Sequence, residues 1–359
     1  MDFFNECRFL WDRLKSSHKP IVIYGTGDGA DKLLDLCERF HIKISAIFAS
    51  PDFVRDRTFR GYKVESYNNV CERFDDFIIL LSFAVFKDDM YERMFELREH
   101  HEFYAPDMPL FGGDILTPDE VRKRADEIRR AYDILADEQS KKVLECVLKY
   151  KITGEIQYLR ECESNRDEIF KKLKLPENPV YLDLGAYDGD TVYEFFERFP
   201  DCARAVAVEP DKANYKKLQS NLKEWNLPAR AVNKAVWSHF CELQFSMESS
   251  RNSHAGDGAD TVLADSIDNI ICTRADYIKM DVEGAERQAL SGMTATMRDY
   301  NPSLCVSAYH QTCDFFTLVN EISEICPNHS IYLRHHKYIP AWETNTYVFQ
   351  TRNLHCLKF

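Results

Sequence analysis

The sequence lacks an excess of basic residues, and this absence limits the partners that the protein can bind. Its 359 residues include 46 lysines and arginines against 59 aspartates and glutamates, which gives a formal net charge of -13. Binding of a polyanion requires clustered lysine and arginine side chains, so this charge argues against nucleic acid as the main partner. A small-molecule or glycan partner is compatible with it.

Long apolar runs and paired cysteines are also missing. No stretch is both long enough and uncharged enough to span a bilayer, and the first residues mix apolar with charged side chains, unlike a signal peptide. The twelve cysteines are scattered singly and form no Cys-x-x-Cys pair that would indicate a zinc or redox site. We therefore expect reduced thiols in a cytoplasmic protein. The oligomeric state stays open, and a homo-oligomer is compatible with the sequence.

The beginning of the chain alternates between strand and helix patterns. An apolar run at 21–24 ends in Gly-Thr-Gly-Asp-Gly and leads into a predicted helix at 30–40. Predicted strands at 44–48 and 77–81 continue the alternation, which is typical of a parallel sheet. We therefore expect a small Rossmann-like α/β domain at residues 1–112.

A helical segment is predicted next, at residues 113–174. Its composition shifts to Glu, Lys, Arg, Leu and Ala, with apolar residues at helical spacing and no strand pattern. A capping box with proline at the first helical position, Thr117-Pro118-Asp119-Glu120, predicts a helix start. We interpret the segment as a linker, with a substrate lid as the alternative.

Residues 175–359 are predicted to form a larger α/β domain. Strands are expected at 180–184, 205–209, 230–235, 277–282, 304–308, 331–334 and 346–349, and helices at 191–198, 212–225, 285–298 and 315–325. The last two strands leave no room for a helix between them. They should therefore form an antiparallel hairpin at the edge of a mostly parallel sheet.

The first strand of this domain ends in a glycine-rich turn. The run is Asp183-Leu184-Gly185-Ala186-Tyr187-Asp188-Gly189, in which the two glycines allow a tight turn and close approach of a ligand. A carboxylate at Asp183 would repel a pyrophosphate but suits the ammonium of a methionine moiety beside a sulfonium. The turn therefore favours S-adenosylmethionine as cofactor, bound by Asp183, Gly185, Ala186, Tyr187, Asp188 and Gly189, over a purely structural loop.

An acidic residue at the end of the next predicted strand fits the same cofactor. Glu209, followed by Pro210, lies about 20 residues beyond the turn, where an acid can accept both hydroxyls of a ribose. A helix-capping role is the alternative for Glu209. We assign Glu209 and Pro210 to cofactor binding.

A third motif, Lys279-Met280-Asp281-Val282-Glu283-Gly284-Ala285-Glu286, runs from another predicted strand into a glycine and a helix. In an extended strand Lys279, Asp281 and Glu283 would share one face. Burial of unpaired charges costs several kcal/mol, so these residues must pair with one another or act. We place Asp281 and Glu283 beside the cofactor's methyl group. The alternative is a Lys279–Asp281 ion pair, with Glu283 and Glu286 capping the following helix.

Together with Leu333-Arg334-His335-His336 and Glu343-Thr344, these motifs resemble those of the FkbM-type methyltransferases over roughly residues 179–350. The resemblance implies a class I Rossmann-like methyltransferase whose sheet ends in an antiparallel hairpin. It also implies methyl transfer from S-adenosylmethionine to a hydroxyl, often on a sugar, glycan or other secondary metabolite. It does not fix the acceptor.

Transfer to a hydroxyl requires removal of its proton, and three residues are candidates for the base: Asp281, Glu283 and His310. His310 follows the strand at 304–308, which brings it to a carboxyl end as well. A lone histidine at a strand end also has a structural interpretation. The same three residues could instead bind a divalent ion that lowers the pKa of the acceptor. The sequence does not decide between a base and a metal.

The N-terminal domain leaves other functions open. Gly25-x-Gly27-x-x-Ala30 resembles a dinucleotide fingerprint, yet the next strand ends in Phe48-Ala49-Ser50 instead of an acid, which makes NAD binding doubtful. The domain resembles those preceding sugar-modifying transferases, which would make it a recognition module. Packing of the glycines against the helix explains them equally well without a ligand. An NAD(P)-dependent oxidoreductase or a non-catalytic nucleotide-sugar-binding protein are the alternatives to a methyltransferase.

Overall fold

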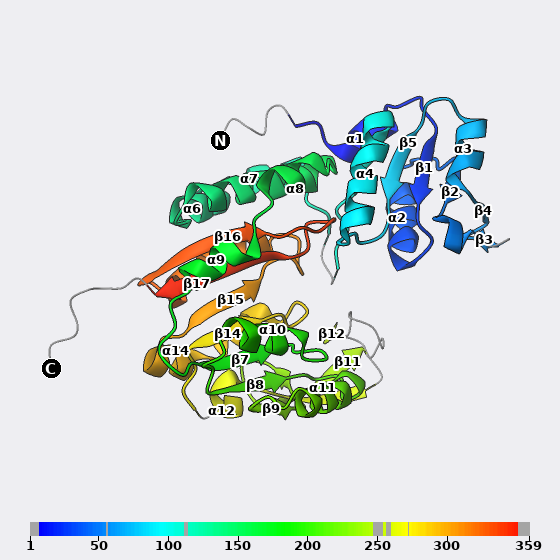
Figure 1. Cartoon of the computed structure of the whole chain (residues 1–359). Coiled ribbons are helices and arrows are strands. Elements are labelled where there is room, and N and C mark those ends of the chain that lie inside the picture. The colour runs from blue at the N-terminus through cyan, green and yellow to red at the C-terminus, as the bar shows by residue number, and fades with distance from the viewer. Residues whose placement is uncertain are drawn as a thin grey trace. The chain divides into compact units, whose positions relative to one another are not determined.

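The computed structural model describes residues 7–54, 57–110, 114–246, 254–255, 260–271 and 273–350, and it divides into two compact units (Figure 1). The first unit comprises the described residues up to Arg129 together with Lys141–Ser164 and His335–Glu343. The second comprises Arg130–Ser140, Asn165–Arg334 and the described residues from Thr344 onward. Among the described residues, no helix is long and apolar enough to cross a membrane.

The first unit contains a six-stranded sheet with the order β3-β4-β2-β1-β5-β6. Its strands are β1 (Ile21–Tyr24), β2 (Ala46–Phe48), β3 (Thr58–Phe59), β4 (Tyr62–Glu65), β5 (Ile78–Leu81) and β6 (Glu102–Tyr104). All neighbouring pairs are parallel except β3 and β4. The helices are α1 (Leu10–Lys15), α2 (Asp28–Arg39), α3 (Tyr67–Arg73) and α4 (Asp88–His100). The predicted alternation of strand and helix is confirmed here.

The glycines between β1 and α2 are explained by close packing. A Cβ atom on Gly25 would lie 2.3 Å from Ser82 Oγ, and one on Gly29 would lie 2.0 Å from the backbone oxygen of Ser82. These glycines therefore let the turn contact the residue that follows β5. A Cβ atom on Gly27 would meet nothing within 4 Å.

Five helices form the segment that the sequence marks as helical. They are α5 (Pro118–Lys123), α6 (Ala125–Ile134), α7 (Glu138–Thr153), α8 (Gln157–Cys162) and α9 (Arg166–Lys172). The Thr117 side chain accepts a hydrogen bond from the Glu120 amide, as expected for an N-cap. The segment is shared between the two units, because 130–140 belongs to the second and 141–164 to the first.

A seven-stranded sheet with the order β16-β17-β15-β14-β7-β8-β9 forms the centre of the second unit (Figure 1). Its strands are β7 (Val180–Leu184), β8 (Arg204–Val208), β9 (Ala229–Val232), β14 (Tyr277–Met280), β15 (Ser303–Ser307), β16 (His329–His335) and β17 (Thr344–Gln350). The pairs from β15 through β9 are parallel, and β17 runs antiparallel to β15. The fold is therefore α/β with the mostly parallel sheet of class I methyltransferases, as predicted.

Helices connect these strands: α10 (Asp190–Arg198), α11 (Lys212–Glu224), α12 (Ile267–Ile271), α13 (Glu286–Ser291), α14 (Thr294–Tyr300) and α15 (Asp314–Ile325). The prediction of a single helix at 285–298 is wrong, because the helix breaks at Gly292 and the chain forms two helices, α13 and α14. A Cβ atom there would lie 2.3 Å from the Trp237 backbone oxygen. The chain therefore packs against residue 237 at this point.

A small second sheet precedes α12 and is not predicted by the sequence analysis. It has the order β10-β13-β11-β12, formed by β10 (Ala235–Val236), β11 (Cys241–Ser246), β12 (His254–Ala255) and β13 (Asp260–Asp265). Its core is limited to Ala235, Val262 and Ala264 with partly buried neighbours. Strands β10 and β12 have only two residues each, which is too short for a periodic pattern in the sequence.

Candidate functional site

The glycine turn after β7 contacts the end of β14. The amides of Gly185 and Ala186 both donate to the Val208 backbone oxygen at 3.0 Å, which ties the turn to β8. Gly185 has a φ of 80°, and a Cβ atom on it would lie 1.8 Å from the Asp281 backbone oxygen. Only glycine fits this position. The close approach brings the first and third sequence motifs together at the carboxyl ends of their strands.

The second half of the turn is held by left-handed residues and one side chain. Tyr187 and Gly189 have φ values of 48° and 93°. Asn221 Nδ2 donates to the Asp188 backbone oxygen at 2.9 Å. A Cβ atom on Gly189 would lie 2.9 Å from a methyl of Leu218, so glycine also suits this close contact with α11.

Glu209 connects the turn to the end of β8. One of its carboxylate oxygens accepts from the Tyr187 amide at 2.9 Å, and the other accepts from the Asp211 amide at 2.9 Å. Burial raises the pKa of Glu209 to about 7. Asn233 Nδ2 donates to the backbone oxygens of Glu209 and Pro210, each at 2.9 Å, and fixes this corner. The second predicted motif thus adjoins the glycine turn directly.

Asp183 is fully buried, and both of its carboxylate oxygens have partners in the protein. The Thr191 hydroxyl donates to one oxygen, and Lys279 Nζ lies 3.4 Å from the other. Lys279 Nζ also lies 3.7 Å from an Asp281 oxygen. Burial raises the pKa of Asp183, although Lys279 acts in the opposite direction. The expected Lys279–Asp281 pair is therefore present, with the ammonium shared between two strands.

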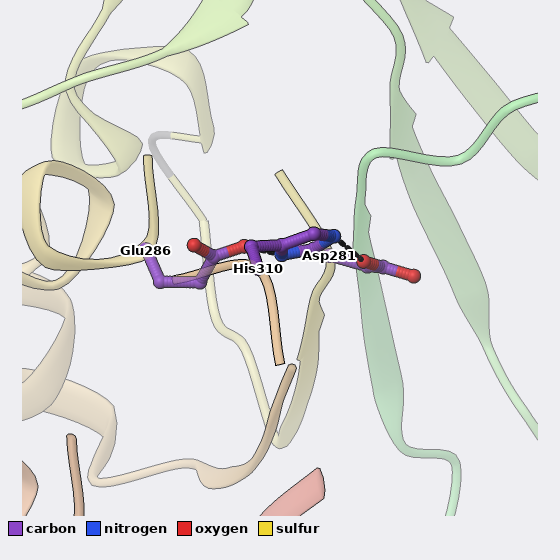
Figure 2. A group of neighbouring side chains, drawn as sticks. All are labelled: Asp281, Glu286 and His310. Carbon is purple, nitrogen blue, oxygen red and sulfur yellow. Dashed lines mark hydrogen bonds and ion pairs between the residues drawn. The ribbon is translucent and has the colours of Figure 1, made fainter. Parts of the chain in front are cut away.

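His310 lies at the centre of an acidic cluster after β15 (Figure 2). Its Nδ1 is 2.8 Å from a Glu286 oxygen, while its Nε2 is 3.3 Å from Glu283 and 3.4 Å from Asp281. The ring is 2% exposed. Burial lowers the pKa of His310, but Glu286, Glu283 and Asp281 together raise it well above its usual value. The Tyr309 hydroxyl donates to Asp281 at 3.1 Å. His310 is therefore a buried imidazolium enclosed by carboxylates.

Glu283 does not belong to a strand, which corrects one step of the sequence interpretation. Strand β14 ends at Met280, and Glu283 and Gly284 both have positive φ values, 54° and 91°. The chain turns here, so a shared strand face cannot explain why Glu283 lies near Asp281. Both instead converge on His310. Their side chains are 30% and 25% exposed.

Glu286 takes part in the site, although the sequence suggested only a capping role for it. One carboxylate oxygen of Glu286 accepts from the Val282 amide at 3.1 Å and the Gly284 amide at 3.4 Å, which resembles the expected cap. The same oxygen meets His310 Nδ1. Glu286 is 1% exposed. The contact joins residues 24 positions apart, and no local pattern in the sequence indicates it.

The site combines four carboxyl groups with two cationic groups: Asp183, Asp281, Glu283 and Glu286, with Lys279 and His310. Such an excess of acid favours a cationic ligand. Among the described residues, Asp281, Glu286 and His310 could hold a metal ion, because each offers a ligand atom within 4.8 Å of the others. The sequence proposed Glu283 in place of Glu286 for this set.

Comparison with known proteins identifies the domain that carries this site. Residues 183–340 match the family described as the methyltransferase FkbM domain, which covers less than half of the chain. Among curated proteins, no sequence matches the chain.

The fold is similar to that of a solved methyltransferase. A crystal structure of methyltransferase FkbM from Methylobacillus flagellatus KT matches with a TM-score of 0.73 and 21% identity, over 92% of this chain and 90% of that one. A precorrin-6y C5,15-methyltransferase from Geobacter metallireducens GS-15 has a TM-score of 0.34 and 14% identity, over 52% and 87%. Fibrillarin from Aeropyrum pernix has a TM-score of 0.32 and 12% identity, over 51% and 72%. Residues 183–340 of the chain thus match the methyltransferase FkbM domain, and the fold is that of class I methyltransferases.

Proposed function

We propose that the protein is an S-adenosylmethionine-dependent O-methyltransferase that acts on a hydroxyl of a sugar, glycan or other small metabolite. The observation that supports this most is the convergence of the glycine turn, Glu209 and the acidic cluster at the carboxyl ends of β7, β8 and β14. Ligands of open α/β sheets bind at this edge. The three elements lie within the FkbM domain.

The residues present fit the proposed cofactor. Each carboxylate oxygen of Glu209 accepts one backbone N–H, and the Asn214 side chain is a third hydrogen-bonding partner, so the carboxylate retains at least one lone pair for a ribose hydroxyl. The excess of acidic groups favours a positively charged sulfonium. We assign Gly185, Ala186, Tyr187, Asp188, Gly189, Glu209 and Pro210 to the cofactor site. Asp183 supports that site through Thr191 and Lys279, because its carboxylate is fully buried and bonded to these partners.

S-adenosylmethionine, when bound, supplies an electrophilic methyl group. The protein must align the acceptor oxygen with it and remove the proton of the hydroxyl. We assign proton removal to Glu283, because its carboxylate lies 3.3 Å from His310 Nε2 and its side chain is 30% exposed. His310 is a positioning residue, since both ring nitrogens already face carboxylates. Asp281 is held by Tyr309 and Lys279 and orients the acceptor.

A metal-assisted reaction is the second candidate, and the compact group of Asp281, Glu286 and His310 favours it. A divalent ion there would lower the pKa of the acceptor hydroxyl. The hydrogen bonds of His310 already satisfy the same carboxylates, so we expect activity to persist after treatment with EDTA. Loss of activity that added Mg²⁺ or Mn²⁺ restores would assign the reaction to a metal instead.

The test of the proposed function compares ligands directly. We expect S-adenosylmethionine to raise the melting temperature of the protein and NAD to leave it unchanged, because a ligand that binds only the folded state stabilises it. Formation of S-adenosylhomocysteine with a panel of sugar and glycan acceptors then measures turnover. A shift with NAD alone would favour the oxidoreductase, and binding without turnover on any acceptor would favour the non-catalytic protein.

A further inference from the structure

A pocket lies at the end of the seven-stranded sheet opposite the candidate site. It has a volume of about 440 Å³, within the range of roughly 300–1,000 Å³ that is typical of small-molecule sites. Its lining includes Lys172, Lys174, Asp276, Ser303, Tyr332 and Phe349. We call it the amino-end pocket.

The position of the amino-end pocket follows from the strand order. Asp276 directly precedes β14, and Ser303 is the first residue of β15. Phe349 lies near the end of β17, which runs antiparallel to β15 and therefore finishes at the same edge. The glycine turn and Glu209 lie instead at the carboxyl ends of the strands. The pocket is therefore separate from the proposed methyl-transfer site, and all of its lining residues belong to the second unit.

The cationic groups of the pocket are only partly neutralised. Lys172 Nζ lies 3.8 Å from an Asp137 oxygen, but the Arg334 guanidinium already binds that carboxylate with distances of 2.7 and 3.1 Å. Lys174 is exposed and forms no ion pair within the described part of the chain. Both ammonium groups therefore retain donors for an anion. This local positive charge contrasts with the net charge of -13 of the whole chain.

The other lining residues include an acid whose carboxylate already has partners in the protein, and two aromatic rings. The Asp276 carboxylate accepts from the Val180 amide at 2.8 Å and from Arg274 Nε at 2.9 Å, so its charge is balanced within the protein. Tyr332 and Phe349 have ring centroids 5.6 Å apart. Aromatic walls beside a few polar groups are typical of sites that bind a small molecule with an apolar body.

We propose that the amino-end pocket binds a small molecule that combines an anionic group, phosphate or carboxylate, with a flat ring. Lys172 and Lys174 bind the anionic group, while Tyr332 and Phe349 contact the ring. Lys172 Nζ also lies 5.4 Å from the centroid of the Tyr332 ring, which places the cation and the aromatic wall side by side. The geometry thus fits a ligand whose charge and ring are adjacent.

Calorimetric titration of the full-length protein with phenyl phosphate tests this proposal. We expect saturable binding that Lys174→Gln weakens about tenfold, because one charge-assisted contact contributes on the order of 1.4 kcal/mol. Lys171→Gln is the matched control, since Lys171 is an exposed lysine of α9, three residues before Lys174, and does not line the pocket. Equal affinities in both variants, or no binding to the wild type, would overturn the proposal.

Three further titrations test which parts of the ligand the pocket recognises and whether the ligand binds in this pocket. Inorganic phosphate should bind more weakly than phenyl phosphate, and equal affinity would remove the role of the ring. Benzoate identifies the anionic group: tighter binding of benzoate assigns carboxylate, and tighter binding of phenyl phosphate assigns phosphate. Saturation with S-adenosylhomocysteine should leave phenyl phosphate binding unchanged. Competition between the two would place phenyl phosphate at the carboxyl ends of the strands and contradict the proposal.

Discussion

Glu209 has a structural and a ligand-binding role in the proposed site. Its carboxylate holds the backbone amides of Tyr187 and Asp211, which fixes the glycine turn on β8. The same carboxylate is the proposed acceptor for the ribose hydroxyls. Because burial raises its pKa to about 7, its protonation changes near neutral pH. The geometry of the turn and the charge of the site therefore depend on one residue.

The raised pKa of Glu209 predicts a specific dependence of stability on pH. In the unfolded chain this carboxyl has its ordinary pKa of about 4.5. The folded state binds the proton of Glu209 more tightly than the unfolded state does. The stability that this proton contributes is therefore complete below pH 4.5 and is lost as the pH rises through about 7. Glutamine does not titrate. As the pH rises from 5 to 8, we therefore expect the free energy of unfolding of Glu209→Gln to increase relative to that of the wild type, by up to about 3 kcal/mol. Urea denaturation across this range measures it, and a constant difference between the two proteins would contradict the assignment.

The role assigned to Glu283 predicts that its substitution lowers the rate of methyl transfer without weakening the binding of S-adenosylmethionine. Glu283→Gln removes the proposed base and should lower kcat by at least about 100-fold, while the affinity for S-adenosylmethionine changes less than about twofold. Glu224→Gln, a change of an exposed acid at the end of α11, serves as control and should leave both unchanged. Measured kcat for methyl transfer and calorimetric affinity report the two effects. Unchanged kcat in Glu283→Gln would exclude it as the base.

At the scale of elements, the two glycine turns of the chain use glycine for the same physical reason. Each turn follows a buried strand and packs closely against the end of a neighbouring strand. Gly25 and Gly29 pack against Ser82, and Gly185 packs against Asp281. The contact at Gly185 joins two motifs of the proposed site, whereas the contacts at Gly25 and Gly29 need no ligand to explain them.

This packing predicts different outcomes for alanine substitutions in the two turns. Gly185→Ala should destabilise the protein by at least about 2 kcal/mol, because the residue has a positive φ and its Cβ would overlap the Asp281 backbone. Gly27→Ala should change stability by less than about 0.5 kcal/mol, since φ is -108° and the space is open. Melting temperatures of both variants test this. Equal shifts would contradict the close approach of β7 and β14.

The sequence predicts the bounds of a helix or strand best where a local apolar pattern alone determines them. Strand β7 is an apolar run before a glycine, interrupted by Asp183 alone, and its bounds are those expected. Strand β14 ends earlier than predicted, because the charges that suggested a long strand face lie in a turn with positive φ at Glu283. The break at Gly292 depends on a contact with residue 237, which local periodicity does not contain.

At the scale of the whole molecule, the site depends on contacts between distant segments. The sequence indicates Asp183, Glu209 and Asp281 because each lies near the carboxyl end of a predicted strand, and parallel strands bring these ends to one edge. It does not indicate that Lys279 pairs with Asp183, or that Glu286 meets His310 across 24 residues. Such pairings are decided by strand order and helix placement. Motif positions were therefore more predictable than the partners of their side chains.

The most direct test of the proposed methyltransferase is a crystal structure of the protein with S-adenosylhomocysteine. We predict that the ribose hydroxyls donate to Glu209, that the turn at 185–189 contacts the ligand, and that its sulfur points toward Asp281 and Glu283. Density for the ligand away from the carboxyl ends of β7, β8 and β14, or no density at saturating concentration, would contradict the assignment of this edge as the site of methyl transfer.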